Sequence, residues 1–384
     1  MRRLFILTVA GLMFGGLLWL DLLKKDYEWN LPDNLPTPSV PADNPMSNIK
    51  VELGRRLFYD TRLSINETVA CAHCHVQELA FTDALPRSRG ATGELHPRSA
   101  MSLVNVAYGS RLTWANHLLS NLEIQALTPL LGENPVEMGM AGREDQLIAL
   151  LQTDPDYALQ IPEAFPADAD PYSVLNMVRA IASFVRSIIS FDSPYDRYLR
   201  GDALAMNAAE IRGMTLFFSE KTECFHCHGG LNFTDSSTHA DMRIESVGFH
   251  NNGLYNLDDN GGYPPGNTGL HDMTGNRRDM GRFKAPTLRN IAMTAPYMHD
   301  GSIETLDGVL DHYLAGGRFI ADGPWAGDGS RNPYKSIFVR EFELNERERE
   351  DLLAFLRALT DTSVMTNPAF SNPFTAPVNT KPSR

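Results

Sequence analysis

The pattern Cys-x-x-Cys-His occurs twice, as CAHCH at residues 71–75 and as CFHCH at residues 224–228. Together the two pentads contain all four cysteines of the chain, so no thiol is left over for a disulfide elsewhere. A c-type haem needs this pattern, because the two thiols bind its vinyl groups and the histidine binds its iron. The sequence therefore favours two covalently bound haems. Their predicted attachment and proximal residues are Cys71, Cys74, His75, Cys224, Cys227 and His228.

Zinc and a redox disulfide are the weaker alternatives for a pair of cysteines two residues apart. The two halves of a zinc ribbon stand about 15–20 residues apart, whereas these pentads lie in different halves of the chain. A thioredoxin-like pair does not explain why a histidine follows in both copies. The other histidines of the pentads, His73 and His226, are expected to be ordinary loop residues.

Length, charge and the N-terminus limit the cellular setting. With 384 residues, of which 43% are hydrophobic, the chain can form two globular domains. Its net charge of −13 argues against nucleic acid as a partner. Residues 1–25 have two arginines, an apolar run and then two lysines, which predicts an export signal or a membrane anchor. Either way, most of the protein is expected in the periplasm. Residues 26–45 are expected to form a linker or a surface arm.

A short repeat indicates two related domains. GRRLF at residues 54–58 precedes the first pentad and GMTLF at 213–217 precedes the second. An amphipathic helix is expected downstream of each copy, at residues 171–190 and at 345–360. The second of these begins with a capping box formed by Asn345 and Glu348.

We therefore expect a mainly helical fold of two cytochrome c-like domains, at 46–200 and 201–362. Each domain would carry one haem facing the domain interface, and residues 363–384 would form a C-terminal tail.

Two further segments of the second domain have predicted structures. The stretch between the second pentad and residue 284 is rich in Gly, Asn and Asp and is expected to be a long functional or docking loop. Residues 302–315 are expected to form a helix that ends at two glycines. Tyr313 falls on the apolar face of this helix and His312 about 100° away from it. Spacing alone favours Tyr313 as a core aromatic residue. The loop's own His250, His271, Tyr255 and Tyr263 are expected to be ordinary side chains.

Several stretches run in order from about residue 50 to 315: LGRRLFYDTRLS, CAHCH, LEIQALTPL, NPVEMG, CFHCH and APTLRNIAMTAPYMHDGS with its following HY. Together they resemble the di-haem cytochrome c peroxidase and MauG superfamily. Within it, SLVNVAY, LTWAN and DHYLAGG are most similar to the MbnH-like branch. The resemblance implies that hydrogen peroxide reacts at the haem on His75, while the haem on His228 stores charge.

The resemblance also implies the sixth ligand of the second haem. The position of Tyr313 is a methionine in the peroxidases and a tyrosine ligand in MauG. A hard phenolic oxygen stabilises oxidised iron, whereas a thioether raises the potential. Met293 and Met298 are rival ligands by chemistry, but they lie outside the matching position.

On the first haem, the resemblance assigns the distal side to Gln125 and Glu137, with Pro129 crowding the same pocket. A carboxylate there can take a proton from peroxide and return it to the departing oxygen. Trp114 matches a tryptophan placed between the two haems, where its ring would carry electrons. Trp19, Trp29 and Trp325 match no motif and are expected in the membrane segment, the arm and a surface loop.

The sequence departs from the peroxidases at two places. Glu94 stands where a histidine usually blocks the first haem, so an open, five-coordinate iron is expected, although His96 lies two residues on. Ser99 stands where an asparagine helps to bind an interdomain calcium ion. The remaining calcium ligands implied by the family are the backbone carbonyls of Thr294 and Pro296.

The resemblance implies an extracytoplasmic di-haem oxidoreductase that uses hydrogen peroxide to form high-valent haem and to oxidise a partner protein. A tryptophan side chain is the expected target, because MbnH-like proteins oxidise a tryptophan in a copper-binding partner. One alternative is a cytochrome c peroxidase that reduces hydrogen peroxide with electrons from a small cytochrome or copper protein. Another is a non-catalytic di-haem electron carrier, in which both irons would be six-coordinate.

Overall fold

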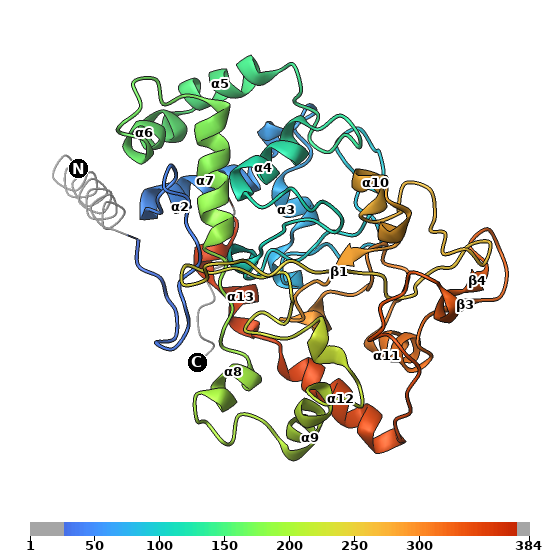
Figure 1. Cartoon of the computed structure of the whole chain (residues 1–384). Helices are drawn as coiled ribbons and strands as arrows, with labels where there is room; N and C mark the ends of the chain where they lie inside the picture. The colour runs from blue at the N-terminus through green and yellow to red at the C-terminus, as the bar shows by residue number, and fades with distance from the viewer. Residues whose placement is uncertain (1–26, 375–384) are drawn as a thin grey trace, which may run out of the picture.

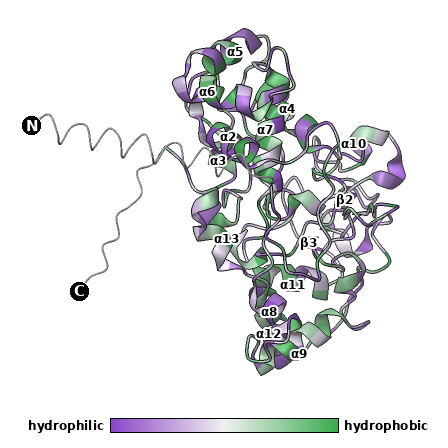
Figure 2. Cartoon of the chain, turned by 90° about the vertical axis from the view of Figure 1, so that its left-hand side faces the viewer, coloured by the Kyte–Doolittle hydropathy of each residue, from purple (hydrophilic) through white to green (hydrophobic). Residues whose placement is uncertain are grey.

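The computed structural model describes residues 27–374 of the chain. The predicted export signal or anchor at residues 1–25 lies outside these residues. Within the described part, no helix is both long and apolar enough to cross a membrane. The helices α5 (Glu144–Thr153) and α6 (Pro155–Ala164) lie at one end of the molecule, and α9 (Ala208–Phe217) and α12 (Glu346–Ala358) lie at the other (Figures 1 and 2).

Helices dominate the structure, as predicted. The first half also contains α2 (Asn48–Tyr59), α3 (Cys71–Cys74), α4 (Leu122–Leu131) and α7 (Val174–Arg186). The second half also contains α8 (Pro194–Leu199), α10 (His271–Thr274) and α11 (Leu306–Leu314), and α13 (Thr362–Thr366) follows α12. Two short antiparallel pairs of strands complete it: β1 (Phe249–His250) with β2 (Phe283–Lys284), and β3 (Phe319–Ile320) with β4 (Gly327–Asp328).

The repeated motif forms the same helix contact in both halves. Gly54 of α2 packs on α7, and Gly213 of α9 packs on α12. A Cβ atom at Gly54 would lie 1.9 Å from the carbonyl oxygen of Ala180, and one at Gly213 would lie 1.8 Å from that of Asp351. Any side chain at these positions would therefore push the two helices apart. The glycine at the start of each repeat therefore lets the backbones of the two helices come into direct contact.

Local sequence signals place the helix ends. The capping box of α12 is present, with Asn345 accepting from the Glu348 N–H at 3.0 Å. The helix predicted at 302–315 begins later, at Leu306, because the Thr305 hydroxyl accepts from the Gly308 N–H and caps it. The segment before it instead pairs in extended form with Tyr297. Gly316 and Gly317, with φ of 64° and 142°, end α11 as predicted.

The described residues form two hydrophobic cores, which exchange segments at the predicted domain ends. Tyr195 of α8 lies before residue 200, yet its ring packs against Phe233 and Phe355 in the second core. Val364 and Phe370 lie in the predicted C-terminal tail, yet both are buried in the first core. The described part of that tail, residues 363–374, thus crosses back to the first half. We call this segment the strap.

The strap is held by hydrogen bonds as well as by apolar packing. The Gln77 side chain donates to the carbonyl oxygens of Val364 and Asn367, each at 2.9 Å. The N-terminal arm is also tied down, because the Tyr108 hydroxyl donates to the Pro36 carbonyl at 2.8 Å. The expected surface arm therefore lies against the first half.

The Gly-, Asn- and Asp-rich stretch before residue 284 is not the structureless loop that its composition suggests. It contains β1, α10 and the start of β2. Tyr255 and Tyr263 are buried in the second core. Their hydroxyls donate to Asp300 at 2.6 Å and to Asn251 at 2.9 Å. The composition of the stretch does not indicate this structure, because its apolar residues are sparse and contact partners that are far away in the sequence.

We predict that Gly213→Val destabilises the protein, because the new side chain must displace the Asp351 carbonyl of α12. Overpacking of this kind costs about 1–3 kcal/mol, so the melting temperature followed by circular dichroism should fall by several degrees. Thr215→Val, an isosteric change at an exposed position of the same helix, is the control. Equal melting temperatures for the two variants would contradict the close helix contact.

Candidate active site

The histidine that ends each pentad is oriented in the same way. His75 Nδ1 donates to the carbonyl of Phe81 at 2.9 Å, and His228 Nδ1 donates to that of Phe233 at 3.2 Å. Both phenylalanines are fully buried and have a positive φ, 60° and 50°, which turns their carbonyls toward the imidazole. This bond fixes the tautomer and leaves Nε2 for a metal. This carbonyl partner was not predicted from the sequence, although Phe-Thr-Asp follows both pentads, at 81–83 and 233–235.

The thiols of Cys71, Cys74 and Cys224 lie in surroundings that disfavour the thiolate. None of the four cysteines forms a disulfide. Burial raises the pKa of Cys71 to about 12 and that of Cys74 and Cys224 to about 11. Zinc binding and redox exchange both use the thiolate, which this environment disfavours. The surroundings of the pentads thus agree better with covalent attachment of a ligand.

A cavity of about 600 Å³ lies beside the first pentad, and Cys71, Cys74 and His75 line it. Its volume is within the range of about 300–1,000 Å³ that is usual for ligand and cofactor sites. The wall is built from both halves, since Lys284, Thr287 and Arg289 also line it. The cavity also contacts Trp114, Gln125, Pro129 and Glu137, four of the residues predicted from the sequence.

The residues present fit a haem. Gln125 lines the cavity, and its side-chain oxygen Oε1 is buried and lacks a hydrogen-bond partner within the protein. Lys284 is buried and lines the same cavity. Burial lowers the pKa of Lys284 to about 8, although Asp235 acts in the opposite direction. Its ammonium group would favour an anionic ligand, and a haem is one through its propionates. Lys284 carries no motif that predicts this position from the sequence.

Glu137 is placed by a tight turn against the loop at 90–94. The Glu137 carbonyl accepts from the Ala91 N–H at 2.6 Å, and the Glu94 carboxylate accepts from the Val136 N–H at 2.9 Å. Gly90 permits this approach, because a Cβ there would lie 1.9 Å from the Val136 carbonyl oxygen. Burial raises the pKa of Glu137 to about 7. The carboxyl group can therefore both release and accept a proton near neutral pH.

His96 lies next to Glu137. Its Nε2 is 3.7 Å from Glu137 Oε1, while its Nδ1 is 3.0 Å from the Arg98 carbonyl oxygen. Burial lowers the pKa of His96, which favours the neutral imidazole. Glu94 stands at the position of the blocking histidine of the peroxidases, and His96 lies two residues on. Both residues thus contact the part of the cavity wall that carries Glu137. The coordination of the first iron stays a prediction.

Trp114 joins the two halves at the cavity wall. Its indole Nε1 donates to the Ser99 carbonyl at 2.9 Å, and its own carbonyl accepts from the Lys284 N–H of β2 at 2.8 Å. The other tryptophans lie elsewhere: Trp29 packs on Tyr27 in the arm, and Trp325 is 41% exposed. Trp19 lies outside the described residues.

The three residues predicted to bind calcium, Ser99, Thr294 and Pro296, line the same cavity. The hydroxyl of Ser99 donates to the Met298 carbonyl at 3.1 Å, and that of Thr294 donates to the Ile291 carbonyl at 3.2 Å. Both hydroxyls are therefore engaged with the protein backbone. Calcium binding at this place stays a prediction.

Tyr313 of α11 lies at the second pentad. Burial raises the pKa of its hydroxyl well above the ordinary value, Cys227 raises it further, and a hydrogen bond with Asn252 acts in the opposite direction. The rival ligand Met298 accepts a hydrogen bond from the Asn252 amide at 3.3 Å, and Met293 packs against the first core. His312 is buried although it is off the apolar face, because α11 is covered on more than one side.

Comparison with known proteins agrees with these features. Residues 48–204 match the family model of di-haem cytochrome c peroxidase. The methylamine utilization protein MauG of Methylorubrum extorquens is 34% identical over 339 residues, which cover 88% of this chain and 85% of that protein. A cytochrome c peroxidase of Escherichia coli is 35% identical over 277 residues, which cover 72% of this chain and 55% of that protein.

Solved structures agree as well. A MauG-like protein associated with microbial copper homeostasis has a TM-score of 0.89 and 49% identity, covering 91% of this chain and 100% of that chain. The di-haem peroxidase BthA of Burkholderia thailandensis, with a TM-score of 0.63 and 21% identity, covers 89% of this chain and 99% of that chain and shares the fold. The chain is therefore an oxidoreductase of the di-haem cytochrome c peroxidase and MauG family.

Proposed function

We propose that this protein is a periplasmic enzyme that uses hydrogen peroxide to withdraw electrons from a partner protein. The observation that carries the proposal is Tyr313, a half-buried tyrosine beside the second pentad. The family resemblance places a methionine at this position in the peroxidases. A hard oxygen ligand favours oxidised iron, whereas a thioether favours reduced iron. A second haem held by His228 and Tyr313 suits an enzyme that stores oxidising equivalents rather than one that receives electrons from a small cytochrome.

The haems would supply redox-active iron, and the chain would supply proton transfer and orientation. We assign the first haem to Cys71, Cys74 and His75, and the distal proton transfer to Glu137. With a pKa near 7, Glu137 can take the proton from the inner oxygen of peroxide and deliver it to the departing oxygen. Gln125 would orient peroxide through its unpaired Oε1, and Pro129 would limit the space beside it.

The two haem sites differ in the residues around them, and Trp114 is placed to connect them. Its indole contacts the cavity of the first site, while its backbone is bonded to β2 of the second half. The indole is fixed by its hydrogen bond to the Ser99 carbonyl, and the backbone of Trp114 is fixed by its bond to Lys284. We therefore assign Trp114 to electron transfer between the two sites.

The partner we propose is a protein side chain, specifically a tryptophan in a copper-binding protein. Two similarities support this choice. The MauG-like protein of 49% identity is associated with copper homeostasis, and the motifs SLVNVAY, LTWAN and DHYLAGG are most similar to MbnH-like proteins. The second candidate is a cytochrome c peroxidase, which the E. coli relative favours. Rapid turnover of peroxide with reduced cytochrome c would support that candidate and contradict ours.

We expect Tyr313→Phe to remove the oxygen ligand from the second haem. The oxidised wild-type protein should show one high-spin and one low-spin haem by electron paramagnetic resonance, and the variant should lose the low-spin signal. Tyr334→Phe, which removes a hydroxyl elsewhere in the second half, should leave the spectrum unchanged. An identical spectrum for the Tyr313 variant would rule out this ligand, and two low-spin haems in the wild type would rule out the open first site.

We also expect the rate of peroxide consumption to rise with pH through about 7. Glu137 is neutral below its raised pKa and charged above it, and only the charged form can accept the proton from peroxide. Glu137→Gln should lower the rate by about 10²–10⁴-fold and abolish this pH dependence. The matched control is Glu133→Gln, an exposed glutamate of the same loop. Stopped-flow absorbance measures both quantities, and a pH profile unchanged by Glu137→Gln would refute the assignment.

A further inference from the structure

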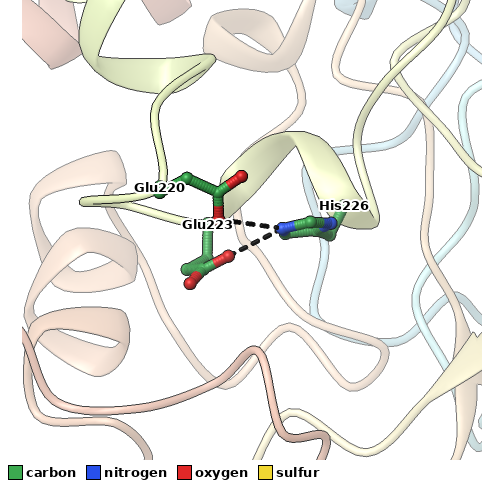
Figure 3. Close-up of side chains that lie close together, drawn as sticks. All are labelled: Glu220, Glu223 and His226. Atoms are coloured by element: carbon green, nitrogen blue, oxygen red, sulfur yellow. Dashed lines mark ion pairs between the residues drawn. The ribbon is translucent and has the colours of Figure 1, made fainter.

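Three potential metal ligands converge at the second pentad. None of them is a residue assigned to the haem. They are Glu220, Glu223 and His226, whose ligand atoms all lie within 4.8 Å of one another (Figure 3). His226 Nε2 is 2.7 Å from Glu223 Oε2 and 3.6 Å from Glu220 Oε2. In the described part of the chain, this is the one group of three or more His, Cys, Asp or Glu side chains with such spacing.

The local backbone explains why the three side chains meet. The spacing Glu-x-x-Glu-x-x-His puts Glu223 and His226 three residues apart across the turn η4 (Cys224–His226). Side chains three residues apart lie on the same face of a 3₁₀ turn. Glu223 has a φ of +58°, and Glu220 comes shortly after the end of α9. The ring of Phe338 stacks on His226 at 4.1 Å and fixes the plane of the imidazole.

The buried atoms of this cluster are suited to binding a cation. The side chain of Glu223 is only 6% exposed, and its Oε1 is paired with Arg340. Its Oε2 and the Nε2 of His226 are both buried and lack a hydrogen-bond partner. They lie 2.7 Å apart, but not in an aligned hydrogen bond. A buried acceptor oxygen facing an imidazole nitrogen in this way is satisfied by a positive ion that both can bind.

The distances suit a transition metal. An ion about 2.0–2.2 Å from each ligand atom would make a nitrogen–metal–oxygen angle of roughly 80° with Glu223 and roughly 120° with Glu220. The Glu220 side chain is 77% exposed and can adjust to the ion. Arg340 would hold the other oxygen of Glu223, as outer partners of metal ligands do. One imidazole with two carboxylates favours zinc or copper over calcium or magnesium.

We propose that Glu220, Glu223 and His226 form a binding site for one divalent transition-metal ion, of the zinc or copper(II) class. Solvent would complete the coordination, because Glu220 faces the surface. His226 stands between Cys224 and Cys227, so the ion would add positive charge close to the second haem. Its occupancy would then raise the reduction potential of that haem, because added positive charge favours the reduced iron.

The test uses the untagged holoprotein after removal of metals with EDTA. We expect isothermal titration with copper(II) or zinc(II) to show one equivalent of tight binding. Glu220→Gln and His226→Ala should each weaken binding at least about tenfold, while both cysteines and His228 remain to hold the haem. His239→Ala, at another histidine of the second half, should bind as the wild type does. The copper(II) spectrum by electron paramagnetic resonance should show coupling to one imidazole nitrogen, absent in His226→Ala.

Two outcomes would overturn the site: no stoichiometric binding, or equal binding by the wild type and both variants. Either would mean that the cluster is an ion pair only. The Glu220 side chain is 77% exposed, so Glu220→Gln is expected to fold as the wild type does, and an unchanged melting temperature checks this. Peroxide consumption is expected to persist in both variants, which keeps this test independent of the proposed function.

Discussion

The hydrogen bond from each proximal imidazole to a phenylalanine carbonyl determines where the chemistry of this protein can take place. It sets the plane of the ring and directs Nε2 to one point. The bond holds because Phe81 and Phe233 are themselves anchored in the two cores. Those cores in turn rest on the helix pairs in which Gly54 and Gly213 allow backbone to approach backbone. Packing far from the pentads thus sets the orientation of the two imidazoles.

The same scaffold supports two unequal sites. Beside the first pentad, both halves enclose a cavity that contains a carboxyl group with a pKa near neutrality. Beside the second, the half-buried phenol of Tyr313 lies close to the pentad. Burial raises the pKa in both cases, but with opposite consequences. Glu137 becomes able to exchange protons at neutral pH, whereas Tyr313 is kept protonated until something binds its oxygen.

The sequence predicts well what depends on neighbours along the chain. The capping box at Asn345 and the glycine end of α11 appear as expected, because a few adjacent residues determine them. The pentads predict haem attachment for a similar reason. Gln125 and Glu137 needed family resemblance, since an isolated polar residue carries no sign of the cavity that it will line.

What the sequence did not predict involves contacts between distant segments. Val364 reaches a core built from residues hundreds of positions earlier, and no local pattern distinguishes it from a residue of a free tail. The hydrogen bond between Glu94 and Val136 likewise joins two loops whose sequences do not indicate each other. The proposed metal-ligand cluster is partly predictable. Its three-residue spacing can be seen in the sequence, but the turn that aligns the three side chains cannot.

The exchange of segments between the cores has a mechanical consequence. Separating the halves at residue 200 would remove Val364 and Phe370 from one core and Tyr195 from the other. Neither half is therefore a complete smaller cytochrome, and hinge motion between them would require apolar side chains to leave their cores. The distance between the two pentads is consequently a fixed dimension of the fold, and under the proposed function it is the distance that an electron crosses.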